Sequence, residues 1–239
     1  YPGTDHIGDP VFEPEHFNEA CVRIDGMGMQ IATHAIGDLA IRRTLDGYEA
    51  ARKVNDPRDP RDPRDSRHRV EHIEVLPRDD LPRFAELGVA AFMQPVTRRG
   101  DGSFPRTASI RCCTRSTDHG LRLADDPGDG ARMCFSTDLP VIQVDVMDSV
   151  RAVAGLLEMP APWVDQTQSL EDTLRSYTLD NAWLEFAEDR KGRLAPGYLA
   201  DVVVMDHDRR GDGSERLNTA RAALTVMGGG VTWGGVKGP

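Results

Sequence analysis

Three side chains of metal-binding type lie at or near the ends of predicted strands. His34 ends the run MQIATH, His72 lies in HRVEHIEVL, and Asp138 ends ARMCFSTD. Two imidazoles and a carboxylate suit Zn²⁺ or another divalent ion, provided that one coordination position stays open for water. If the strands are parallel, their carboxyl ends meet at one face, where catalytic groups collect in a barrel. The spacing therefore allows a metal site built from these three residues.

Each of these residues also has a purely structural interpretation. A histidine at a strand end can be a hydrogen-bonded structural group, and Asp138 in STDLP could cap a turn. The other histidines lie in polar or helical surroundings and are predicted to be surface groups: His6, His16, His68, His119 and His207. Spacing alone leaves both interpretations open.

The elements that must position these side chains alternate between strand and helix. Short apolar runs over 29–34, 68–76, 89–95 and 131–138 predict four strands. Helical spacing of apolar residues predicts helices over Glu15–Gly26, from Asp38 onward, over Asp79–Leu87, near Val146–Leu157 and over Leu170–Thr178. The last of these begins with a capping-box-like Ser169 and carries Leu170, Leu174 and Tyr177 on one face.

The period of the sequence changes after KGRLAPG. YLADVVVMD and AALTVMGGGVTW predict further strands, the latter pair joined by a glycine run. We therefore expect an α/β protein in which residues 1–195 form part of a barrel and 196–239 a small separate sheet. Four parallel strands are half of a (β/α)₈ barrel, and 239 residues are too few for eight such units plus the terminal sheet.

Two segments interrupt this order. Residues 55–67 hold three copies of Asp-Pro-Arg, which neither bury apolar surface nor permit a helix, and they predict a solvated extended insert. An electrostatic docking tag is the alternative. Residues 97–130 are irregular, and a loop of this length is usually functional or disordered.

The composition argues against several kinds of partner. With 29 Lys and Arg against 39 Asp and Glu, the net charge of −10 repels nucleic acid and anionic lipid. Apolar runs fall far short of the roughly 18–20 residues that cross a bilayer, and no signal-peptide pattern is present. Four cysteines without a C-x-x-C pair are typical of a reducing compartment. They predict free thiols with no role in a disulfide, a metal site or redox chemistry. We expect a cytoplasmic protein that acts on a small molecule.

Four ordered motifs resemble the metal-dependent amidohydrolase superfamily, specifically its YtcJ-like (amidohydrolase-3) branch. They are IATHAIGDLAIRRTLDGYEAA, RHRVEHIEVLPRDDLPRFAELGVAAFMQP, CFSTDLPV and RKGRLAPGYLADVVVMD, and the resemblance runs from about Gly8 to Gly235. It implies the C-terminal half of a (β/α)₈ TIM-like barrel (strands 5–8), followed by part of a small β-sandwich. It also implies one or two divalent metal ions and hydrolysis of an amide or related C–N bond by metal-bound water.

The resemblance assigns roles residue by residue. His34 matches the strand-5 histidine, His72 the strand-6 histidine and Asp138 the strand-8 aspartate, which ligates metal and takes the proton from water. Gln94, at the end of the strand-7 segment, and Asp38, at the start of a helix, are candidates for substrate contact. A packed glutamine and a helix cap are the structural alternatives.

Several parts of the family pattern have no counterpart in this sequence. No H-x-H pair is present, no lysine occupies the strand-4 position, and Leu139 stands where tryptophan is common. The first residue is Tyr1 rather than Met, so we expect the N-terminal half of the barrel to be missing. Alone, the chain should bind metal poorly, be inactive and self-associate through unpaired strand edges, with a homo-oligomer as one outcome. A non-catalytic half-barrel acting as an interaction module is the main alternative, and an unrelated acidic domain is a third.

Overall fold

Four short parallel strands form the central sheet of the protein. The computed structural model describes residues 10–55, 65–95, 131–141, 146–154, 168–206 and 220–234. The strands pair in chain order as β1 (Ala32–Ala35), β2 (Arg69–His72), β3 (Ala90–Met93) and β4 (Met133–Phe135). All three pairings are parallel, which confirms the predicted βα order.

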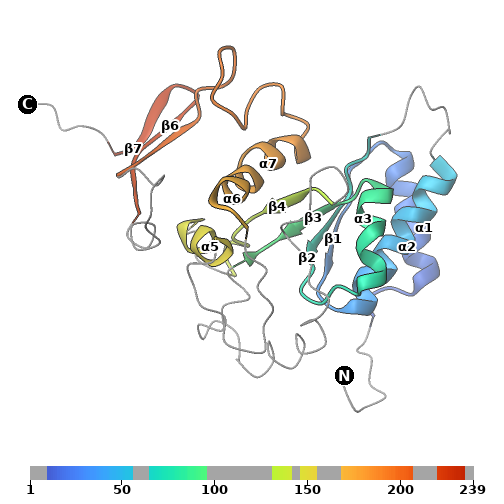
Figure 1. Ribbon diagram of the computed structural model, residues 1–239. Helices are drawn as coiled ribbons and strands as arrows, with labels where there is room; N and C mark the ends of the chain where they lie inside the picture. The colour runs from blue at the N-terminus through green and yellow to red at the C-terminus, as the bar shows by residue number, and fades with distance from the viewer. Residues whose placement is uncertain are drawn as a thin grey trace, which may run out of the picture.

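Helices connect the strands and cover the sheet. In chain order they are α1 (Pro14–Gly26), α2 (Asp38–Asn55), the 3₁₀ turn η1 (Arg78–Asp80), α3 (Leu81–Leu87), α5 (Val146–Val153), α6 (Leu170–Tyr177) and α7 (Leu179–Leu184). Figure 1 shows α1, α2 and α3 grouped on one side of the sheet. As predicted, α3 ends at Gly88, whose φ of 67° is left-handed and favours glycine.

The main core lies between this sheet and its helices. Alternate strand residues such as Val70, Ala91 and Met93 are buried against the apolar stripe of α2, including Ile41 and Leu45. The opposite face of the sheet carries a smaller cluster of Ala90, Cys134 and Leu184, the last contributed by α7. Neighbouring residues on a strand, such as Ala90 and Ala91, therefore pack on opposite faces of the sheet, as the pleat requires.

The predicted apolar face of α6 is partly wrong. Leu174 is 45% exposed, whereas Thr173 and Ser176 are buried. The hydroxyl of Thr173 donates to the carbonyl of Ser169 at 2.8 Å, which satisfies it without water. The capping prediction is confirmed, because the Ser169 side chain accepts from the backbone N–H of Asp172.

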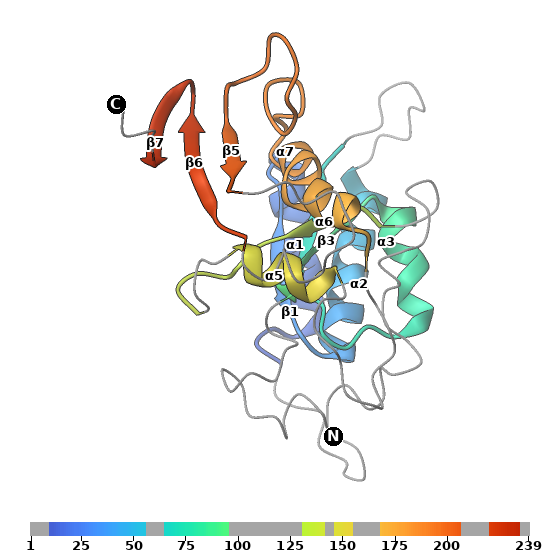
Figure 2. The same cartoon turned by 60° about the vertical axis from the view of Figure 1, so that its left-hand side comes forward.

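A second, antiparallel sheet follows. It contains β5 (Val202–Met205), β6 (Ala222–Met227) and β7 (Gly230–Gly234) in that order. Gly228 and Gly229 both have positive φ in the turn between β6 and β7, a conformation that suits glycine. Figure 2 shows this sheet set apart from the first, and Met205 and Ala220 pack against residues of α5 and α6.

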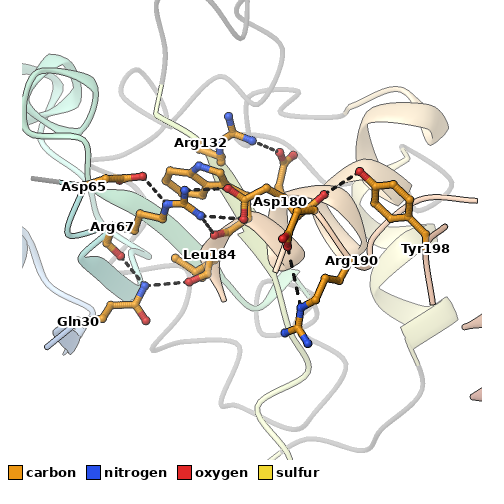
Figure 3. Close-up of polar contacts among 11 residues, drawn as sticks. Gln30, Asp65, Arg67, Arg132, Asp180, Leu184, Arg190 and Tyr198 are labelled. Carbon is orange, nitrogen blue, oxygen red and sulfur yellow. Dashed lines mark hydrogen bonds and ion pairs between the residues drawn. The ribbon is translucent and has the colours of Figure 1, made fainter. Parts of the chain in front are cut away.

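Arg67 joins the start of β2 to the segment around α7 (Figure 3). Its guanidinium binds both carboxylate oxygens of Glu188, at 3.0 and 2.8 Å, and it also bonds to Asp65. The same guanidinium lies 4.5 Å from the ring centre of Trp183 and 4.4 Å from that of Phe186. A charged group with this many contacts fixes the C-terminal segment against the sheet.

Several predictions fall outside the described residues. These are most of the Asp-Pro-Arg insert and the 97–130 loop, with Cys112, Cys113, His6, His119 and His207. Cys21 and Cys134 are free and buried, which confirms the prediction of unpaired thiols at those two positions. Burial raises the pKa of each to about 12, so neither is a ready nucleophile. Among the helices described, none has the length and apolarity to cross a bilayer.

Candidate metal centre

The imidazoles of His34 and His72 lie side by side at the carboxyl edge of the parallel sheet. β1 and β2 are neighbours, and His72 pairs with Ala35, the residue after His34. The two ring centres are 4.2 Å apart with an interplanar angle of 63°, an edge-to-face contact. The structure therefore brings the two histidines together on adjacent strands.

An unusual backbone turns His72 toward His34. Simple alternation along β2 would send His72 to the same face as Val70, which is buried in the main core. Instead, His72 and Ile73 have φ of 76° and 54°, and Ile73 occupies the core in its place. Left-handed φ is uncommon outside glycine and a clear outlier for a β-branched residue, so the local structure must hold it.

Asp138 follows β4 and has a left-handed backbone of its own, with φ of 60°. Its carbonyl accepts from the backbone N–H of Val141 at 2.8 Å, which closes a turn just beyond the strand. The negative charge of Asp138 raises the pKa of His34, against the larger effects that lower it.

The histidine pair favours neutral His34. Although His34 is exposed, partial desolvation at the sheet edge is the largest cause that lowers its pKa, and His72 lowers it further, while Asp138, Glu71 and Glu74 oppose the shift. A neutral imidazole has the free nitrogen lone pair that a divalent metal needs.

The residues present fit a metal only in part. Two facing imidazoles and a carboxylate are the donor types that Zn²⁺ prefers. Within the ranges that the structure describes, however, no three His, Cys, Asp or Glu side chains lie close enough to hold an ion together. His34, His72 and Asp138 therefore do not form an ion site by themselves, and a metal at this edge would need further ligands.

The two candidate substrate contacts lie in different surroundings. Gln94 follows β3 and is buried, with its amide nitrogen 3.2 Å from the Ser136 hydroxyl. Asp38 is exposed at the start of α2, where its carboxylate accepts from the N–H of Leu39 at 2.8 Å. The structure gives each a protein partner, and substrate contact stays a prediction for both.

Glu71 is a residue of this region that the sequence analysis missed. Its carboxylate accepts from Arg69 at 2.7 Å and lies 3.4 Å from the amide nitrogen of Gln94. The side chain shares the face of the sheet that carries His34, its pairing partner across β1 and β2. In the sequence, polar Arg69 and Glu71 alternate with apolar Val70. This alternation already indicates that Glu71 lies on the face of the sheet opposite the main core.

The prediction that His68 is a surface group is wrong. His68 is 6% exposed, and its Nδ1 accepts from the N–H of Ile31 at 3.1 Å. The proton must therefore reside on Nε2, which donates to Asp25 at 3.1 Å. Ser66 also donates to Asp25, so serine and histidine share one carboxylate and the serine is not activated as a nucleophile. His16, by contrast, is exposed, which confirms the prediction that it is a surface group.

The chain is similar to known amidohydrolases over nearly its whole length. The model of the amidohydrolase family matches residues 2–232, nearly the whole chain. The YtcJ protein of Bacillus subtilis (strain 168) is 26% identical over 215 residues, covering 86% of this chain and 38% of that protein. The N-substituted formamide deformylase of Arthrobacter pascens is 24% identical over 205 residues, covering 85% of this chain and 36% of that enzyme.

A solved structure of a metal-dependent hydrolase is also similar to this chain. An uncharacterized metal-dependent hydrolase from Pyrococcus furiosus has a TM-score of 0.63 and 26% identity, covering 81% of this chain and 36% of that chain. The chain spans less than two fifths of the length of the curated relatives it matches. The extent of the family match, with the order of its motifs, shows that the chain belongs to the amidohydrolase family, in its YtcJ-like branch.

Proposed function

We propose that this chain is the C-terminal half of a metal-dependent hydrolase that cleaves an amide or another C–N bond. The observation that carries the proposal is the facing pair of His34 and His72, with Asp138 acting on His34 from the end of β4. Family membership supports a hydrolase, and the name of the formamide deformylase supports a C–N bond as the target. N-acyl amino acid-like compounds and cyclic amides are the proposed substrates.

The residues of this chain have distinct roles in the proposed reaction. His34 and His72 would hold the metal through their imidazole nitrogens, and Asp138 would contribute a carboxylate oxygen. When bound, one or two divalent ions such as Zn²⁺ supply a Lewis acid that polarises the carbonyl and activates water. Asp138 accepts the proton of the attacking water and returns it to the leaving nitrogen.

The proposal requires a second half of the barrel. A catalytic zinc normally has three protein ligands and an open position, and within the described residues no three candidate ligands converge. β1 and β4 are the two edge strands of the parallel sheet. We propose that an N-terminal half pairs with both edges, closes the (β/α)₈ barrel and supplies the missing ligands.

The test compares the 239-residue chain with the full-length protein from the source reading frame. Metal content is measured by mass spectrometry, and activity on a panel of N-acyl amino acids and N-substituted formamides. We expect the full-length protein to bind metal and hydrolyse at least one class, and the short chain to do neither. His34→Ala should abolish metal binding. As the control, His16→Ala changes an exposed histidine in the first turn of α1 and should leave metal binding intact.

Two outcomes would overturn the proposal. A full-length protein without bound metal and without hydrolysis would favour the non-catalytic half-barrel. A monomeric short chain with stoichiometric metal and turnover would show that no second half is needed.

A further inference from the structure

A chain of polar side chains crosses three strands just below the candidate metal centre. Arg69 Nε donates to Glu71 Oε1 at 2.7 Å, and Gln94 Nε2 lies 3.4 Å from Glu71 Oε2. The same nitrogen is 3.2 Å from the hydroxyl of Ser136. An amide NH₂ has two hydrogens, so Gln94 can donate to both partners at once. The result is a hydrogen-bonded link from β2 through the end of β3 to the end of β4.

The link lies next to each candidate ligand. Glu71 immediately precedes His72 and pairs with His34 across β1 and β2. Ser136 is two residues before Asp138, and its N–H bonds to the carbonyl of Met93 at 3.0 Å. The polar chain therefore ties the end of β2, which carries His72, to the end of β4, which leads to Asp138. His34 lies beside Glu71 through the pairing of β1 with β2.

From this arrangement we infer that Glu71 is a positioning residue of the metal centre, acting through its link to Gln94 and Ser136. The inference rests on the proposed function. The carboxylate of Glu71 is already engaged by Arg69, so its part is to fix the spacing of the strand ends rather than to bind the ion.

The backbone of the site explains why such a link is needed. His72, Ile73 and Asp138 all have positive φ, a conformation that persists only where the surrounding structure holds it. Partners that hydrogen-bond directly to a metal ligand contribute about 10–100-fold to metal binding, and Glu71, which acts on the ligands through the strand ends, should contribute at the lower end of that range. Without the link, the end of β2 that carries His72 loses its side-chain connection to β3 and β4, so the His72 ring is free to move relative to His34.

The experiment measures metal affinity in the full-length protein by Zn²⁺ competition with a chelator. Glu71→Gln keeps the size of the side chain and removes its charge. Glu74→Gln is the matched control, because Glu74 also acts on the charge of His34 but has no hydrogen bond to this link among the described residues. Ser136→Ala cuts the far end of the link without changing any charge.

We expect Glu71→Gln to weaken Zn²⁺ binding by about 10-fold, Ser136→Ala to weaken it by a smaller factor, and Glu74→Gln to have little effect. Equal losses for Glu71→Gln and Glu74→Gln would show that only charge matters and would overturn the inference. If Glu71→Gln does not fold, unchanged affinity in Ser136→Ala would overturn it as well.

A crystal structure of metal-free Glu71→Gln separates this inference from the proposed function. We expect the His34 and His72 ring centres to move beyond their 4.2 Å separation. If the unaltered full-length protein binds no Zn²⁺, the proposed function fails, and the ring separation alone then decides. Rings that stay in place in the variant would refute a positioning role for Glu71.

Discussion

Replacing Gly192 with alanine tests how tightly the segment between α7 and β5 is packed. Gly192 has φ of 92°, which L residues with a side chain rarely adopt. An added Cβ would lie 2.7 Å from the Cβ of Ala182 and 3.1 Å from both the Cα of Leu179 and the carbonyl oxygen of Thr178. Ordinary contacts between carbon atoms are about 3.5–4.0 Å, so the methyl group would overlap main-chain atoms that cannot rotate away.

The structure sets the expected magnitude. The left-handed backbone alone costs alanine about 1–2 kcal/mol. Overpacking adds about 1–3 kcal/mol, which gives a total loss of about 2–5 kcal/mol in the free energy of unfolding. Gly88→Ala is the matched control, since Gly88 has φ of 67° and nothing within 4 Å of an added Cβ. It should lose only the backbone part, about 1–2 kcal/mol.

Urea denaturation of the full-length protein, followed by circular dichroism, measures both losses from the shift in midpoint. The difference between the two variants is the informative quantity, because it isolates the overlap with Ala182, Leu179 and Thr178. If Gly192→Ala and Gly88→Ala lose the same free energy, the crowding argument is refuted.

Three further predictions concern pH, the arginine link and the proposed base. The folded pKa of His68 lies below its ordinary 6.5, because burial outweighs the opposing effect of Asp25. As the pH falls, the unfolded chain therefore binds the proton of His68 before the folded protein does. The free energy of unfolding, measured by urea titration, should fall as the pH drops below about 6.5. A His68→Gln variant whose free energy of unfolding changes with pH in the same way would contradict this. Arg67→Lys should cost about 1–3 kcal/mol through loss of its paired bonds, while Arg190→Lys, whose side chain is 67% exposed, should change little in the same assay. Asp138→Asn in the full-length protein should lower kcat by about 10²–10⁴-fold with thermal stability retained, and near-normal kcat would move the role of base elsewhere.

The sequence predicted the helices and strands better than the burial and hydrogen-bond partners of single side chains. Apolar periodicity located the four strands and the helices around them except α7, because burial of one face dictates that spacing. The strand-end positions of His34 and His72 also followed from the order of βα units. These features depend on short stretches of sequence, which is why they could be predicted.

The rest depended on partners far along the chain. His68 lies among charged residues in the sequence, yet Asp25, 43 positions away, makes its burial possible. The left-handed backbone at His72 has no signal in the sequence, since neither it nor Ile73 is glycine. The link through Glu71 likewise needs Gln94 and Ser136, which become its neighbours only when the strands align.

The left-handed backbone at His72 sets the requirements of heat resistance and of chemistry against each other. With φ of 76°, folding alone favours glycine over histidine at this position by about 1 kcal/mol. A library selected only for survival at high temperature should therefore accumulate Gly at 72, whereas position 138 should show no such drift, because aspartate tolerates a left-handed backbone. The same library selected for turnover should keep histidine at 72, at the expense of a lower melting temperature.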